Sequence, residues 1–167
     1  LQLKDFNKAT KCLEVLSNSF PNDLEVLQIL AEAYLLTNDK EKAILVFKSI
    51  SEKDPKNGQV HLTLANFYRD NGDLDKSFSE LKLAFRSDKI SIETKLAILS
   101  SYLPIINAND TIKNQAFELA EILKRSDFNN SGIYAVFGDL YYATGNKTLA
   151  KKNYKKSLSI DQNLQAV

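Results

Sequence analysis

The sequence has one cysteine, Cys12, and one histidine, His61. A single cysteine cannot form an internal disulfide, which excludes a disulfide-stapled scaffold and fits either a reducing or an oxidising compartment. A single histidine disfavours zinc sites and catalytic triads, because both need a histidine with further ligands or partners nearby. The sequence therefore predicts no metal site, no cofactor and no catalytic residues, and His61 is interpreted as a packing contact between helices.

An excess of charge of either sign is also missing. The 22 Lys and Arg residues against 21 Asp and Glu residues give a net charge of +1. Nucleic-acid-binding domains usually carry a marked positive excess, so no nucleic-acid partner is expected. No apolar run approaches the roughly 18 residues of a membrane-spanning helix, so no membrane insertion is expected of this chain.

What the chain does have is a repeated pattern. The Leu30-Ala31 pair and Tyr34 return as Leu64-Ala65 and Tyr68, at an offset of 34 residues. A fixed period in this range is typical of a solenoid, in which each unit is too small to bury its own apolar face and stacks on its neighbours.

The clearest unit predicts two helices joined by a turn. Its first half carries apolar residues three and four apart from Leu24 to Leu35, which predicts one stripe on a helix. Residues 37–39 form the turn, and the second helix follows with Ala43 at its centre. Pro55 ends it, because the residue before a proline is driven out of helical geometry.

The period divides the chain into one array with an irregular third unit. Tyr102 keeps the period and is assigned to a first helix, but Ala116 arrives five residues late. Pro104 removes a backbone donor, so the second helix is predicted to restart near Asp110 or Thr111. The predicted boundaries are a half repeat (second helix only) at 1–23, repeats at 24–57 and 58–91, an irregular repeat at 92–130 with an insertion of about five residues at 104–110, a repeat at 131–164, and the start of a further unit at 165–167.

These residues resemble the tetratricopeptide repeat family. The matching positions are the small residues Ala31, Ala65 and Gly138, the tyrosines Tyr34, Tyr68 and Tyr141, the second-helix residues Ala9, Ala43, Ser77, Ala116 and Ala150, and the closing prolines Pro21 and Pro55. The early position, where the family has a tryptophan-like residue, departs from the pattern and holds Leu27, His61 and Tyr134. The resemblance implies an all-α fold, a right-handed superhelical solenoid of antiparallel helix pairs. Such proteins are scaffolds and adaptors, not enzymes.

The resemblance also implies a concave groove lined by the first helices. Its predicted residues include five acids and one base, so the groove is expected to prefer a neutral or basic, partly apolar segment. The alternative interpretation is that these side chains are merely solvated faces. The candidate groove residues are Glu25, Gln28, Glu32, Gln59, Leu62, Asn66, Arg69, Asp70, Glu93, Leu96, Ser100, Asp139 and Tyr142.

A lysine cluster near the end of the chain is the best candidate for nucleic-acid contact. It is interpreted instead as a solvated outer face, with Tyr154 in the core rather than stacking on bases. The cluster is Lys147, Lys151, Lys152, Lys155 and Lys156.

The expected function is a protein–protein interaction scaffold that binds a peptide or partner protein through the groove. The alternative is an accessory or spacer domain of a larger multidomain protein, including an enzyme, with no ligand of its own. The chain is expected to be a fragment of a longer array, with self-association through its truncated ends at Leu13 and Leu16. Frequent Lys and Asn favour a bacterial genome, and both the cytoplasm and the periplasmic side of the envelope stay open as compartments.

Overall fold

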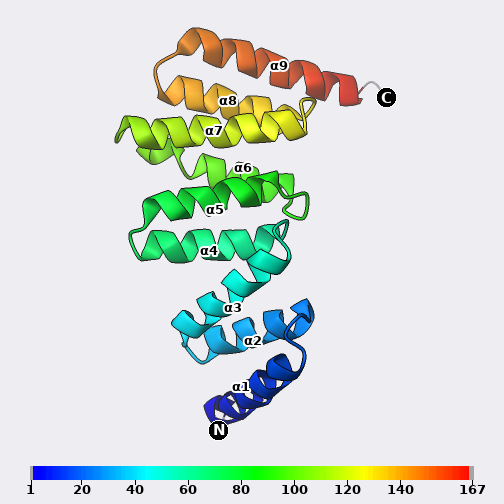
Figure 1. Ribbon diagram of the computed structural model, residues 1–167. Helices are drawn as coiled ribbons and strands as arrows, with labels where there is room; N and C mark the ends of the chain where they lie inside the picture. The colour runs from blue at the N-terminus through cyan, green and yellow to red at the C-terminus, as the bar shows by residue number, and fades with distance from the viewer. Residues whose placement is uncertain (1, 166–167) are drawn as a thin grey trace. The chain divides into compact units, whose positions relative to one another are not determined.

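The computed structural model describes residues 2–165, with side-chain surroundings for residues 6–161; residues 166–167 of the predicted further unit lie outside the described residues. Within this range the fold is all-α, with nine α-helices, one short 3-10 helix and no strand (Figure 1). The helices are α1 (Gln2–Ser19), α2 (Leu24–Leu36), α3 (Lys40–Lys53), α4 (Gly58–Asp70), α5 (Leu74–Arg86), α6 (Ile92–Ser100), η1 (Leu103–Ile105), α7 (Asp110–Ser126), α8 (Ser131–Ala143) and α9 (Lys147–Gln165).

Asn and Asp side chains start most of these helices. Asp23 accepts hydrogen bonds from the backbone N–H groups of Glu25 and Val26 at the start of α2. Asn57, Asn109 and Asn130 cap α4, α7 and α8 in the same way. These side chains satisfy amides that have no partner inside the helix, so the sequence fixes the helix starts locally.

The turn inside a helix pair has a recurring backbone geometry. Asn38, Gly72 and Gly145 adopt φ values of +61°, +78° and +82° at equivalent positions in three pairs. Glycine takes a positive φ without steric cost, and asparagine is among the residues that tolerate it best. Residues that tolerate a positive φ therefore stand in the turns of all three pairs.

The chain divides into two compact units, residues 1–84 and 85–167, with the boundary inside α5. The core of unit 1 is formed by α2, α3 and α4, around Leu30, Phe47 and Leu64. Ala31 and Ala43 are fully buried, which is consistent with the close approach of α2 and α3. The Ser77 hydroxyl of α5 donates to the Ala65 carbonyl of α4 over 2.7 Å. A small polar residue therefore joins the two helices of the next pair.

Unit 2 contains α6 to α9, and its core centres on α7 and α8. Leu119, Leu123, Phe137 and Leu140 are buried there. Gly138 of α8 lies against the ring of Tyr154 of α9, where an added Cβ would overlap the ring. Small size at this position is therefore a packing requirement.

The structure corrects one detail of the irregular segment. Helix α6 ends at Ser100, so Tyr102 lies outside it and precedes η1, which contains Pro104. Ser101 and Tyr102 keep right-handed helical φ and ψ values, but Pro104 has no backbone N–H to donate to the Ser100 carbonyl. The α-helical hydrogen-bond ladder therefore cannot continue, and the chain tightens into a 3-10 turn. Helix α7 begins at Asp110, within the predicted restart.

The segment between η1 and α7 is packed rather than loose. Ile106 is buried, and the Asn107 side-chain amide donates to the Ala143 carbonyl at the end of α8 over 2.9 Å. One apolar and one polar contact therefore fix this connection within unit 2.

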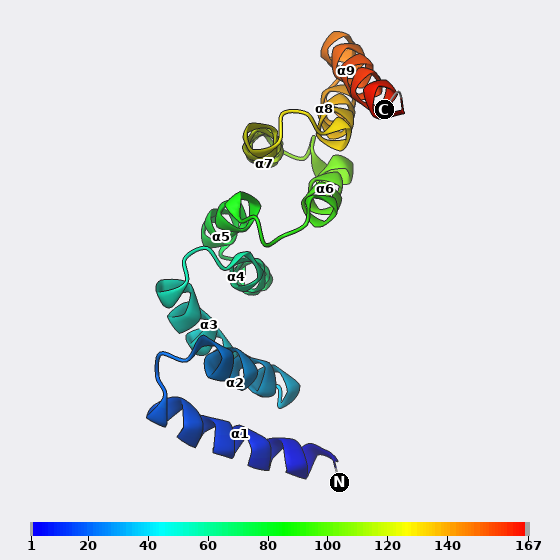
Figure 2. The same cartoon turned by 90° about the vertical axis from the view of Figure 1, so that its right-hand side faces the viewer.

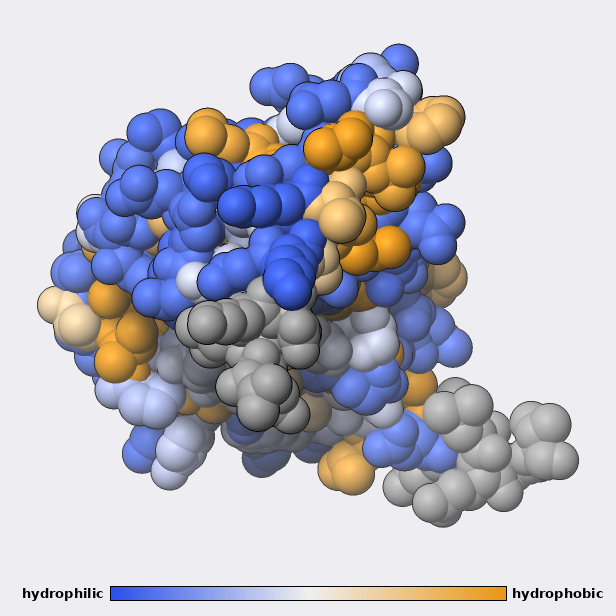
Figure 3. Space-filling view, turned by 90° about the horizontal axis from the view of Figure 1, so that it is seen from below, coloured by the Kyte–Doolittle hydropathy of each residue, from blue (hydrophilic) through white to orange (hydrophobic). Residues whose placement is uncertain are grey.

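Helix α1 packs on α2 with one face and leaves apolar residues on another. Leu16 is 40% exposed, whereas Ile50, one repeat period later, is 1% exposed. Val15 and Phe20 are also exposed. Figure 3 looks from below, the side where α1 lies in Figure 1, and shows hydrophobic residues gathered among hydrophilic ones.

Candidate functional site

The exposed face of α2 carries the first three groove residues predicted from the sequence. Glu25, Gln28 and Glu32 are all exposed, and the Gln28 amide donates to a Glu32 carboxylate oxygen over 3.2 Å. Neither glutamate forms an ion pair with the described residues. Two carboxylates on one helix face are thus available to a positively charged group.

Two apolar residues on the same face were missed by the sequence analysis. Ile29 is 45% exposed and Leu36 is 63% exposed, although both are large aliphatic residues. Their spacing from each other and from Glu25 and Glu32 places all four on one side of the helix. That register is the signal in the sequence that could have identified them. The predicted buried stripe also ended one residue too far, since Leu35 is 43% exposed.

Helix α4 presents the second predicted set within unit 1. Gln59, Asn66, Arg69 and Asp70 are exposed and Leu62 is half-buried. Arg69 Nε lies 3.6 Å from an Asp70 carboxylate oxygen, in a solvent-exposed pair. This face is therefore mixed in charge, unlike the face of α2.

Unit 2 holds the remaining predicted residues on α6 and α8. Glu93 and Ser100 are exposed and Leu96 is half-buried, with its Cδ1 packed against Gly132 of α8. Tyr142 is 64% exposed. Asp139 differs from the others, because it accepts the Tyr154 hydroxyl at 2.7 Å and so has an internal role.

Two tyrosines have phenols with shifted pKa values for the same reasons. Burial, reinforced by a hydrogen bond to Glu14, raises the pKa of Tyr34 to about 12. Burial and the hydrogen bond to Asp139 raise the pKa of Tyr154 to about 12. Both hydroxyls therefore stay protonated as donors over a wide pH range and join adjacent helices within their own units.

Lysine side chains bond to the aspartates at three helix starts and lower the pKa values of those aspartates. Hydrogen bonds from Lys42, Lys76 and Lys113 lower the pKa values of Asp39, Asp73 and Asp110 respectively. Each lysine follows its aspartate by three residues, so the pairs support their own helices. They are structural features rather than parts of a site.

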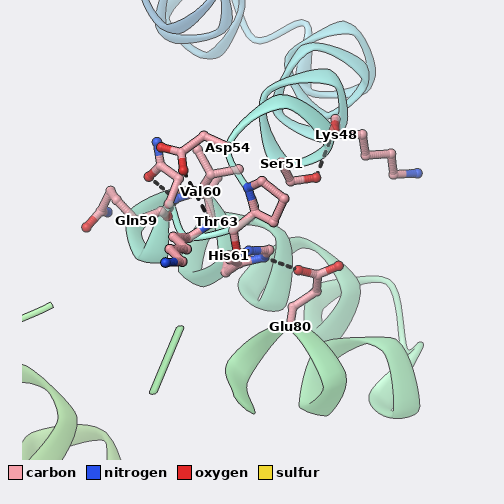
Figure 4. A network of polar contacts seen from close by, with 11 residues as sticks. Lys48, Ser51, Asp54, Gln59, Val60, His61, Thr63 and Glu80 are labelled. Carbon is pink, nitrogen blue, oxygen red and sulfur yellow. Dashed lines mark hydrogen bonds and ion pairs between the residues drawn. The ribbon is translucent and has the colours of Figure 1, made fainter. Parts of the chain in front are cut away.

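His61 is a buried contact, as the sequence analysis expected. Figure 4 shows its ring between the α3–α4 turn and Glu80 of α5. Nδ1 lies 2.6 Å from a Glu80 carboxylate oxygen, and Nε2 lies 3.0 Å from the Pro55 carbonyl oxygen. Both partners are oxygen acceptors, so each ring nitrogen donates only where it carries a proton.

Tyr134 occupies the equivalent position in α8 and makes a similar contact. Its hydroxyl donates to the Phe128 carbonyl over 3.0 Å, six residues earlier in the chain, as His61 does to Pro55. At this repeat position, the polar groups of His61 and Tyr134 thus hydrogen-bond a helix to the turn before it.

Within the described residues, no group of three or more His, Cys, Asp or Glu side chains is arranged to hold a metal ion. None of the described helices combines the length and the apolar character required to cross a membrane.

Comparisons with known proteins agree on the repeat. A family model described as Tetratricopeptide repeat matches residues 1–61, and a second with the same description matches residues 131–164. A crystal structure of MamA is similar, with a TM-score of 0.58 and 18% identity over 98% of this chain and 93% of that chain. A second MamA crystal structure gives a TM-score of 0.57 and 18% identity over 95% and 84%. No curated protein matches significantly.

The likeness to MamA shows the fold alone at this level of identity, whereas the two family matches cover more than half of the chain, one at each end. They include the segments that contain the buried Ala31 and Ala43 and the segment where Gly138 lies against Tyr154. The chain belongs to the tetratricopeptide repeat family and is an all-α helical-repeat solenoid.

Proposed function

We propose that this chain is a protein-interaction scaffold whose first-helix faces bind a neutral or basic, partly apolar segment of a partner protein. Tetratricopeptide repeats generally serve as non-catalytic scaffolds, which supports the general class. The observation that carries the specific proposal is the face of α2, where Ile29 and Leu36 are exposed beside Glu25 and Glu32.

Each part of this face has a physical role in the proposal. Ile29 and Leu36 offer apolar area, whose burial provides about 25 cal/mol per Å² before the costs of association. Glu25 and Glu32 attract cationic side chains and disfavour acidic ones, which sets specificity and association rate more than affinity.

Each of the other first-helix faces adds contact groups of its own. Gln59, Asn66 and Arg69 of α4 supply hydrogen-bonding groups within unit 1. In unit 2, the exposed ring of Tyr142 is suited to act as an aromatic anchor, because tyrosine combines apolar area with a polar tip.

A peptide titration tests this proposal. The probe is a fluorescent peptide rich in Lys and Leu, compared with a counterpart in which Gln replaces Lys. We expect the Lys peptide to bind more tightly and to lose affinity as salt is added, because exposed charges are screened. Glu25→Lys with Glu32→Lys should weaken binding about tenfold.

The matched control is Glu41→Lys with Glu52→Lys, which makes the same change in net charge on the exposed surface of α3. It should leave the affinity nearly unchanged. Equal losses in both double variants would show that only net charge matters and would overturn the assignment to α2.

A second candidate function has its own supporting observation. Val15 and Leu16 of α1 and Phe20, directly after it, are exposed. This favours an accessory or spacer domain of a larger protein, with no ligand of its own, whose contacts run through its terminal helix. A chain that binds neither probe peptide but associates through α1 would support this alternative.

A further inference from the structure

A hollow in unit 2 lies away from the residues of the proposed groove. It has a volume of about 300 Å³ and is formed by α7, α8 and α9, which lie next to one another in Figure 1. Its principal lining residues are Lys124 of α7, Tyr134, Phe137 and Tyr141 of α8, and Lys152 and Lys156 of α9.

The floor of the hollow is aromatic and fixed in place. Phe137 is buried, and its ring centroid lies 6.3 Å from that of Tyr141. Tyr141 in turn packs against Phe117 of α7, with centroids 4.9 Å apart. Tyr134 is held by its hydrogen bond to the Phe128 carbonyl. The floor is therefore a preformed apolar surface.

The rim of the hollow is cationic. Lys124 Nζ lies 5.0 Å from the Phe137 ring centroid and 3.4 Å from a Glu121 carboxylate oxygen. Lys156 Nζ lies 5.9 Å from the Tyr134 ring centroid. Lys152 and Lys156 form no ion pair with the described residues. Lys152 and Lys156 thus bring two positive charges to the lining without a counter-charge among those residues.

The floor and rim together select the ligand. Ammonium groups beside an apolar surface favour an anion that carries an apolar neighbour, because both parts then lose water together. Lys124 and Lys156 already lie over the Phe137 and Tyr134 rings, so a planar nucleobase cannot stack on those faces. A flexible apolar side chain can still contact Tyr141 and Leu149 of the same lining. The observations favour carboxylates in a peptide over a nucleic acid.

We propose that this hollow binds an acidic segment of a partner protein, in which a carboxylate contacts Lys152 and Lys156 and an adjacent apolar side chain rests on the aromatic floor. The segment differs in charge from the one proposed for α2. The chain would therefore hold two protein segments of opposite charge. The inference stands on unit 2 alone and does not require the proposed groove.

The test uses the full chain and a fluorescent peptide of alternating Glu and Phe residues. Its comparisons are a peptide with Gln in place of Glu, and a single-stranded oligonucleotide of the same charge. We expect saturable binding of the Glu peptide only. Lys152→Glu with Lys156→Glu should weaken that binding about tenfold.

The lysine cluster itself provides the control. Lys151→Glu with Lys155→Glu makes the same change in charge at the same spacing on another side of α9, and should change the affinity less than about twofold. Equal losses in both variants, or tighter binding of the oligonucleotide, would overturn the proposal. So would the absence of binding to the Glu peptide.

Amide chemical shifts of the unmodified protein give a readout that does not depend on how the variants fold. The Glu peptide should shift residues of α7, α8 and α9 that line the hollow. Shifts confined to α2 and α4 would overturn the proposal for unit 2 and would also contradict the charge preference proposed for α2.

Discussion

At the scale of single residues, His61 joins three segments of unit 1: α4, the turn before it and α5. Its equivalent in the first full pair, Leu27, is an apolar core residue. One position of the repeat therefore accepts either an apolar side chain or a polar one whose partners are supplied, because a buried polar group is tolerated only when it is hydrogen-bonded.

Replacing His61 should show how much its two hydrogen bonds contribute to the free energy of unfolding. His61→Phe keeps an aromatic ring but leaves the Glu80 carboxylate and the Pro55 carbonyl without a hydrogen-bond partner on that ring. We expect the free energy of unfolding to fall by about 2–3 kcal/mol in urea denaturation. Thr63→Ala, two residues along α4 and less buried, is the control and should have a small effect. A stability unchanged by His61→Phe would contradict this role.

The two tyrosines with raised pKa values predict a loss of stability at alkaline pH. The phenols of Tyr34 and Tyr154 have pKa values of about 12 in the folded chain, against an ordinary value of 10.0. The unfolded chain therefore loses these protons first as pH rises. The stability they contribute is complete below pH 10 and declines as pH rises towards 12.

Tyr154→Phe removes one of these ionisations and should reduce the alkaline loss of stability in thermal unfolding. Tyr142→Phe, on an exposed ring, is the control and should leave the pH profile as it is. An alkaline profile that Tyr154→Phe leaves unchanged would show that this phenol does not couple to folding.

At the scale of elements, the contact between α8 and α9 depends on the absence of a side chain at Gly138. Gly138→Ala would gain up to about 1 kcal/mol of helix propensity. The added methyl group overlaps the Tyr154 ring, which Asp139 holds by a hydrogen bond. Overpacking costs about 1–3 kcal/mol, so we expect a net loss in the free energy of unfolding.

A double-mutant cycle with Tyr154→Ala separates the two effects of Gly138→Ala. Without the ring, Gly138→Ala should no longer destabilise the chain and should show its helix-propensity gain. An equal destabilisation in both backgrounds would mean that the methyl group meets something other than Tyr154.

Several elements could be predicted from the sequence because their causes are local. Asn and Asp at helix starts, a positive-φ residue in the turns and apolar spacing determine where the helices begin and which face is buried. Other features depend on distant residues. The exposure of Ile29 and Leu36 and the buried contact of Lys95 Nζ with the Ser87 carbonyl belong to that group.

The candidate groove residues could be predicted in part, because the exposure of a residue on a helix also depends on local spacing. Helical register placed the polar groove residues on exposed or half-buried positions, because the opposite face is apolar. Register could not show that Asp139 holds Tyr154 or that three helices form a cationic hollow, since both depend on packing between helices.

At the scale of the whole molecule, the exposed apolar residues in α1 and directly after it predict concentration-dependent association. Val15, Leu16 and Phe20 expose apolar area that gains free energy by leaving water. Sedimentation velocity should show a rise in sedimentation coefficient with concentration. Leu16→Glu with Phe20→Glu should abolish it, and Leu45→Glu, on an exposed site of α3, should not. A strictly monomeric wild-type chain at high concentration would contradict the prediction.

The proposal that the first-helix faces bind a partner is tested most directly by mapping where a peptide binds. The measurement is the change in amide chemical shifts of the full chain as the Lys and Leu peptide is added. The account predicts shifts centred on Glu25, Ile29, Glu32 and Leu36 of α2 and on the exposed face of α4. Shifts confined to α1 or α9, or none at saturating peptide, would contradict it.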